Sequence, residues 1–153
     1  MLRRNLDTAE WYHHAPFMNS LSRYADTVYC IMRLVVGLLF ACHGGQKLLS
    51  FPPGGSGGAV EGMALVAASI ELVGGFLIAF GFLTRIAAFI ASGLMACAYF
   101  MVHHKMGPFP LVNKGELAVM YCWVFFFMFF YGPGRLSIDA LIGKGKAAAT
   151  TTP

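Results

Sequence analysis

One carboxylate, Glu71, lies near the middle of a stretch that is otherwise apolar or small, Ala64 to Leu83. A helix of that length spans about 30 Å, the thickness of the hydrocarbon core of a bilayer. Because an ionised side chain at the centre of a bilayer is costly, Glu71 must face protein, water or a proton rather than lipid. Such a group can bind a ligand or exchange a proton, and the chain must supply its partner.

The candidate partner is Arg33, which lies inside another apolar stretch, Thr27 to Leu49. At about 1.5 Å per residue, Arg33 lies roughly 9 Å and Glu71 roughly 18 Å from the same membrane face, a gap that an extended arginine largely covers. We therefore predict an intramembrane ion pair between them, as the candidate catalytic pair. Such a pair either fixes helix register or takes part in proton-linked ligand binding.

Further bases and imidazoles lie at the other ends of the apolar stretches. We expect His43, Lys47, His103 and His104 to form a cluster at one outer rim, where they could bind a cofactor. A quinone carbonyl or a heme iron would suit imidazoles, although solvated interfacial histidines are the simpler alternative. The chain has no CxxCH motif and its four cysteines lack CxxC spacing, so heme is less favoured than quinone and no metal site is predicted.

The apolar stretches predict an all-α fold, an integral membrane four-helix bundle with spans at about 27–49, 62–83, 86–102 and 116–131. These spans form one domain over 24–142, between an N-terminal interfacial arm at 1–23 and a flexible tail at 143–153. On the first span, Arg33, Gly37, Phe40, Gly44 and Lys47 share one side of the helix. Glycines in that stripe would let a second helix approach closely.

Composition restricts the class of protein further. Hydrophobic residues make up 58% of the 153 residues and charged residues 12%, which excludes an ordinary soluble domain and implies a lipid bilayer as partner. The net charge of +4 does not indicate nucleic-acid binding, because the bases flank apolar segments. Seven basic residues outside the spans lie on one side of the membrane, namely Arg3, Arg4, Arg23, Arg85, Arg135, Lys144 and Lys146, and three lie on the other, namely Lys47, Lys105 and Lys114. Because cytoplasmic loops carry the excess of basic residues, both termini are predicted to be cytoplasmic.

The order of several motifs resembles the DoxX family over roughly residues 29–142. They are Arg33, Gly37, Gly44 and Lys47, then Glu71-Leu-Val-Gly-Gly with Gly81 and Thr84-Arg85, then His103, and finally Gly132-Pro133-Gly134-Arg135-Leu136-Ser137-Ile138-Asp139. The family's usual leucine before the last aspartate is Ile138 here. The resemblance implies a four-helix protein of the bacterial inner membrane in a family linked to redox work, including a subunit of a thiosulfate:quinone oxidoreductase and members associated with sulfur-transfer and superoxide-removing enzymes.

Together these observations predict a subunit of a membrane redox system that handles quinone or small sulfur compounds. In this hypothesis Glu71 handles a proton, Arg33 holds its charge, and His43 or His103 contacts the ligand. Its partners would be other membrane subunits or further copies of the chain. The alternative is a structural accessory subunit of a larger respiratory or photosynthetic complex, with no site of its own.

Overall fold

The computed structural model describes residues 21–54 and 60–143. Most of the arm expected at 1–23, and nearly all of the tail expected at 143–153, lie outside these residues. The described residues contain helices and no strand, which confirms the all-α prediction. The principal helices are α3 (Ala25–Leu49), α4 (Met63–Phe80), α5 (Thr84–Ala98) and α6 (Glu116–Tyr131).

Three of the described helical segments are long and apolar enough to cross a membrane. They are Ala25–Leu49, Met63–Phe80 and Thr84–Met106, the last of which continues α5 through a π-helical turn, η1 (Tyr99–His103), and a 3₁₀ turn, η2 (His104–Met106). The sixteen residues of α6 form a shorter apolar helix.

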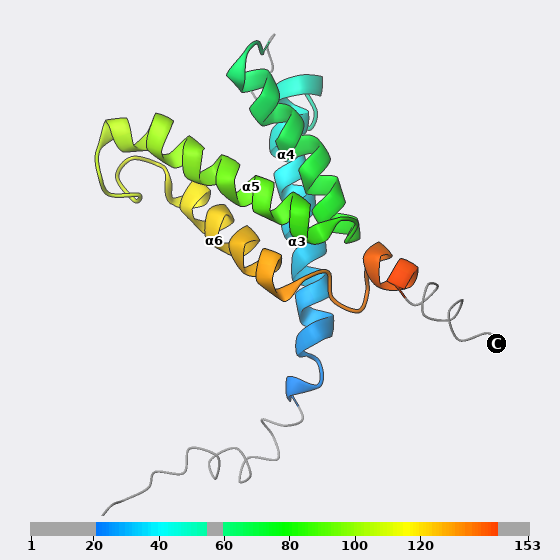
Figure 1. The fold of residues 1–153 in the computed structure, drawn as a ribbon. Helices are drawn as coiled ribbons and strands as arrows, with labels where there is room; N and C mark the ends of the chain where they lie inside the picture. The colour runs from blue at the N-terminus through cyan, green and yellow to red at the C-terminus, as the bar shows by residue number, and fades with distance from the viewer. Residues whose placement is uncertain (1–20, 55–59, 144–153) are drawn as a thin grey trace, which may run out of the picture.

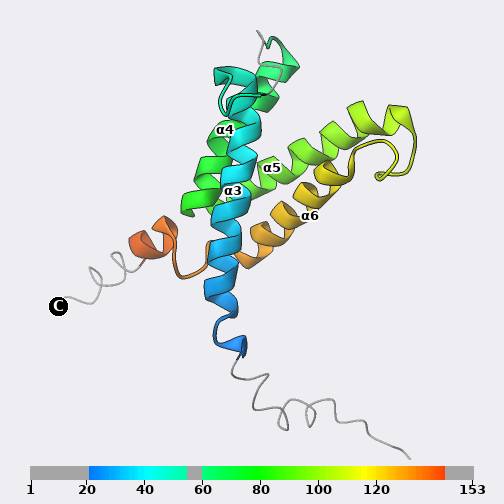
Figure 2. The ribbon, with the colours of Figure 1, turned by 180° about the vertical axis from the view of Figure 1, so that it is seen from behind.

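The helices form two hairpins, α3 with α4 and α5 with α6, which meet at one end and diverge toward the other (Figure 1). We call the end at which α4 turns into α5 the closed end. The end that carries Ser50 and Met106 is the open end. The same divergence is visible from behind (Figure 2). The helices of the two hairpins are therefore furthest apart at the open end.

Glycines bring the backbones of α3 and α4 into direct contact, as the stripe on the first span predicted. A Cβ at Gly37 would lie 2.7 Å from the carbonyl oxygen of Gly75, and a Cβ at Gly44 would lie 2.5 Å from that of Ala68. Contacts this short leave no room for any side chain, and they fix the register of the two helices. Gly44 therefore lies opposite Ala68 and Leu72, the α4 residues on either side of Glu71.

The segment after α6 lies at the closed end, where it contacts both hairpins. Asp139 accepts hydrogen bonds from the backbone nitrogens of Leu83 (2.9 Å) and Thr84 (3.0 Å) at the start of α5. A carboxylate in this place satisfies two amides that begin the helix and opposes the positive end of its dipole. Asp139 thus caps α5 although the two are far apart in the sequence.

We expect Asp139→Ala to lower the free energy of unfolding by about 1–2 kcal/mol, because the first amides of α5 lose their acceptor. Asp139→Asn, which keeps one side-chain oxygen, should lose less. Circular dichroism during titration of the micelle-embedded protein with dodecyl sulfate measures both changes. Equal stability of the alanine variant and the wild type would show that the cap contributes nothing.

Candidate functional site

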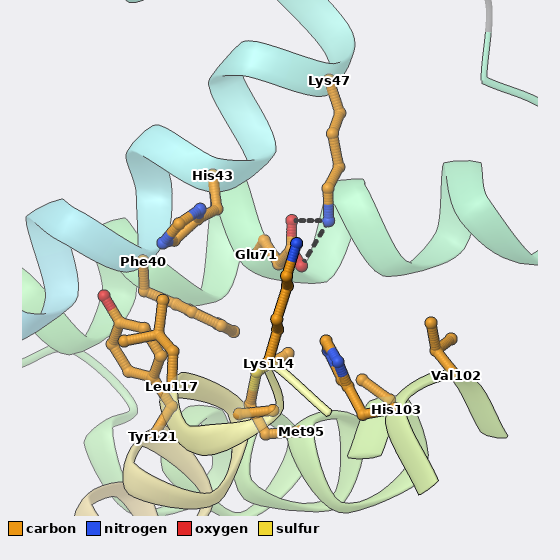
Figure 3. A pocket seen from close by; sticks show the side chains of 12 residues that line it. Phe40, His43, Lys47, Glu71, Met95, Val102, His103, Lys114, Leu117 and Tyr121 are labelled. Carbon is orange, nitrogen blue, oxygen red and sulfur yellow. Dashed lines mark hydrogen bonds and ion pairs between the residues drawn. The ribbon is translucent and has the colours of Figure 1, made fainter. Parts of the chain in front are cut away.

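A cavity of about 320 Å³ lies between the diverging hairpins, and charged groups border it beside an apolar floor (Figure 3). Both hairpins and the loop before α6 contribute to it. The lining residues are Phe40, His43, Lys47, Glu71, Met95, Ala98, Val102, His103, Lys114, Leu117, Ala118 and Tyr121. The site therefore exists only while the two hairpins keep their relative positions.

Glu71 is the only acidic residue in this lining, and its partner is Lys47. The Lys47 Nζ atom lies 2.7 Å from both carboxylate oxygens. Glu71 is buried, whereas the Lys47 side chain is 44% exposed. The pair therefore connects a buried carboxylate to the surface at the open end through the lysine.

The predicted ion pair between Arg33 and Glu71 is wrong. Arg33 donates instead to three backbone carbonyls: Nη1 to Ile78 and, at 2.7 Å, to Ala79, and Nη2 to Leu136 at 2.7 Å. The side chain is only 2% exposed, so it is buried at the closed end rather than in the cavity.

Helix geometry explains why Glu71 pairs with Lys47 and not with Arg33. Eleven residues, or about 16 Å of helix, separate Arg33 from Gly44, which is level with Glu71. Side chains on a helix also lean toward its N-terminus. On α3 this direction carries Arg33 away from Glu71 and brings Lys47, one turn beyond Gly44, back toward it.

The charge of Arg33 is compensated by the end of α4. Ile78 and Ala79 belong to the last turn of this helix, where free carbonyls and the helix dipole favour a cation. Leu136 adds a third acceptor from the segment after α6. Arg33 thus links α3, α4 and the C-terminal segment, and it holds the closed end together.

His103 lines the cavity in a defined orientation. Its Nδ1 lies 3.1 Å from the carbonyl oxygen of Asn113. Because a carbonyl only accepts hydrogen bonds, Nδ1 must carry the proton of this bond, which in the neutral ring leaves the lone pair on Nε2. The residue ends the π-helical turn η1, a type of irregularity that is frequent at functional sites.

The rest of the predicted outer-rim cluster is brought together only in part. His43, Lys47 and His103 border the cavity, whereas His104 does not. His104 is exposed and lies beside the rings of Tyr99 and Phe100, with centroid separations of 6.1 and 6.0 Å. Neighbouring positions on a helical turn point in different directions, so His103 and His104 could not both face the cavity.

Aromatic rings form one wall of the cavity. The His43 ring stands edge-on to Tyr121 at 5.9 Å, and Phe40 packs against Tyr121 at 5.4 Å. Phe125 continues this cluster in the buried core. A planar ring bound in the cavity would meet aromatic faces on this side and the polar groups at the rim.

Sequence reasoning missed Lys114 and Tyr121 as site residues. Figure 3 shows the Lys114 side chain extending into the cavity from the loop before α6. From the sequence alone, Lys114 is a loop base that indicates only the side of the membrane. A signal was present in Asn113-Lys114-Gly115, a turn-forming sequence directly before an apolar helix.

The described residues contain no group of three or more histidine, cysteine, aspartate or glutamate side chains that could hold a metal ion. The four cysteines are all free thiols, and two of them, Cys42 and Cys97, are exposed. The polar side chains that line the cavity belong to lysine, glutamate, histidine and tyrosine, which can form hydrogen bonds, stabilise charge and exchange protons.

The comparisons with known proteins agree with this membrane architecture. The DoxX family model matches residues 28–104. An uncharacterized protein of Haemophilus influenzae is 41% identical over 128 residues, which cover 80% of this chain and 96% of the relative. "Putative oxidoreductase CatD" of Bacillus subtilis is 29% identical over 120 residues, 76% of this chain and 87% of the relative. No solved structure matches the chain. The chain belongs to the DoxX family of membrane proteins.

Proposed function

We propose that this protein binds the head group of a quinone in the cavity between its hairpins, as a subunit of a membrane oxidoreductase system. The observation that supports this most strongly is the buried carboxylate of Glu71, paired with Lys47 at the edge of a cavity whose lining is mostly apolar or aromatic. A buried carboxylate in a membrane protein is costly, and such groups commonly mark ligand sites or proton paths. The oxidoreductase name of the Bacillus relative agrees with a redox role.

Shape and lining favour a quinone over a small sulfur compound. The cavity is within the size range of sites for small organic ligands, and most of its lining is apolar or aromatic. A quinone ring would pack against Phe40 and Tyr121, and its carbonyl oxygens would accept hydrogen bonds from lysine at the rim. A small sulfur compound would leave much of this apolar surface without contacts.

The paired side chains suit proton exchange with a quinone. Reduction to the hydroquinone requires two electrons and two protons. In this proposal a reduced partner protein supplies the electrons. Lys47 holds a transferable proton on its ammonium, Glu71 contacts that ammonium at 2.7 Å, and the exposed part of Lys47 can regain a proton from water.

We further propose that the protein lies in a bacterial inner membrane with both termini in the cytoplasm. Among the described bases, Arg23, Arg85 and Arg135 lie toward the closed end, and Lys47, Lys105 and Lys114 toward the open end. With the closed end cytoplasmic, the cavity would open in the outer half of the bilayer, within reach of quinone dissolved in lipid.

The alternative of an accessory subunit without a site draws on the exposed aromatic side chains of α6. Trp123, Phe127 and Phe130 are all more than half exposed. They could contact another subunit, although lipid would cover them equally well. An accessory subunit of this kind would bind no quinone in the cavity, so quinone binding distinguishes it from the proposed redox subunit.

The test is titration calorimetry of the detergent-purified protein with 2-methyl-1,4-naphthoquinone, followed by rapid reduction with excess dithionite in buffered solution. The absorbance distinguishes the protonated hydroquinone from its anion and so records proton uptake by the ring. We expect the wild type to bind the quinone. Glu71→Gln should slow proton uptake by about 100-fold, as expected for loss of a general acid–base group. The control is Ser69→Ala, whose hydroxyl donates within α4 to Leu65 and does not border the cavity.

If the wild type does not bind the quinone, the cavity is not a quinone site and the accessory role is favoured. If Glu71→Gln matches Ser69→Ala in binding and in proton uptake, Glu71 has no part in the chemistry.

A further inference from the structure

The charges around the cavity do not cancel. Lys47 and Glu71 neutralise each other, but Lys114 also borders the cavity and, among the described residues, has no acidic side chain within ion-pair distance. The two lysines and the one glutamate of the lining therefore sum to one net positive charge. Lys114 is exposed, and a cation of this kind at the mouth of a mostly apolar cavity attracts an anion.

The backbone conformation of Lys114 is unusual for a residue other than glycine. Lys114 has a φ of 57°, a left-handed conformation that glycine adopts readily and that other residues seldom adopt. Its neighbour Asn113 is 1% exposed and fixes the turn, donating to the Gly107 carbonyl at 2.7 Å and accepting from the Gly115 amide at 2.8 Å. Strained positions of this kind are found disproportionately at ligand sites.

The nearest acidic residue in sequence does not remove this charge from the cavity. Glu116 is exposed and does not line the cavity. It borders a separate surface depression, which Lys114 also borders. The Lys114 ammonium, which extends into the cavity in Figure 3, is therefore available to a ligand there.

We infer that the compound bound in the cavity carries one negative charge beside its apolar ring, as an ionised hydroxyquinone does, and that Lys114 binds the charged oxygen. This inference rests on the proposed function, because it specifies the ligand of the same cavity. The ring would pack against Phe40 and Tyr121, and the ionised oxygen would lie toward Lys114. Lys114 is then the residue that sets specificity for the charge of the ligand.

Two quinones that differ in charge provide the test. At neutral pH 2-hydroxy-1,4-naphthoquinone is an anion, whereas 2-methyl-1,4-naphthoquinone is neutral and similar in size. We expect the wild type to bind the anion more tightly by about tenfold, the value of one hydrogen bond between charged groups. Lys114→Gln, whose amide can still donate a hydrogen bond but carries no charge, should remove this preference, and Lys114→Arg should keep it.

The matched control is Lys105→Gln, which removes an exposed lysine near the same loop that does not border the cavity. It should keep the wild-type preference, and retention of the wild-type circular dichroism spectrum by each variant shows that folding is intact. Equal affinity of the wild type for the two quinones, or an undiminished preference in Lys114→Gln, overturns the inference while the proposed function stands. Failure of both quinones to bind overturns the proposed function, and the inference with it.

Discussion

Replacing Arg33 by methionine is expected to lower the free energy of unfolding by about 3 kcal/mol or more. The change removes the buried guanidinium from three carbonyls, of which that of Ile78 keeps the Gly81 amide as a donor while those of Ala79 and Leu136 lose theirs. Arg33→Lys should recover part of the loss, because one ammonium cannot reach all three acceptors in the way a guanidinium does. Arg85→Met is the comparison: this arginine also donates to backbone carbonyls, of Phe129 and Phe130, but is exposed and should cost less.

The same stability measurement, by dodecyl sulfate titration in mixed micelles, distinguishes the observed pairing from the one predicted from the sequence. A double-mutant cycle between Arg33→Met and Glu71→Gln should give a coupling energy near zero, since the two side chains share no contact. A cycle between Lys47→Met and Glu71→Gln should give a clear coupling, because these side chains form the ion pair. Strong coupling of Arg33 to Glu71 would contradict the structure described here.

The second large effect concerns two neighbouring glycines on α4. A methyl group at Gly75 would lie 2.5 Å from the backbone nitrogen of Ala41, whereas at Gly74 it would meet only the Ile70 side chain, at 3.9 Å. We expect Gly75→Ala to destabilise the protein by about 2–3 kcal/mol or more, because the backbones of α3 and α4 must separate.

Gly74→Ala is the control for this change, since both substitutions raise helix propensity by the same amount. It should be neutral, or stabilising by up to about 1 kcal/mol. The two adjacent substitutions should change the free energy of unfolding in opposite directions only if α3 and α4 are in close contact at Gly75. Equal effects in the micelle titration would show that α3 and α4 do not touch at Gly75.

Much of the fold followed from the sequence for simple physical reasons. Long apolar stretches must become helices in a bilayer, because every backbone polar group needs a partner within its own segment. The stripe that contains Gly37 and Gly44 indicated which face of α3 packs against a second helix, and both glycines contact the α4 backbone. The divergence of the two hairpins had no comparable signal, since it depends on contacts between helices that are distant in the sequence.

The site was less predictable than the fold. Glu71 was recognised because a lone carboxylate in an apolar stretch needs a partner, but counting residues from the membrane surface selected the wrong base. Heights alone omit the direction in which a helical side chain leans, and this direction brings Lys47 to the carboxylate. For Arg33 the acceptors are backbone carbonyls at a helix end, which no pattern of charged residues reveals.

The most direct measurement of the central claim is photolabelling of the detergent-purified protein with an azido-1,4-naphthoquinone, followed by mass spectrometry of its peptides. The account predicts adducts on the cavity lining of α3, between Phe40 and Lys47, and on residues 114–121, with labelling suppressed by excess unlabelled naphthoquinone. Adducts confined to the outward-facing aromatic residues of α6, such as Trp123 and Phe130, and insensitive to the competitor would contradict it.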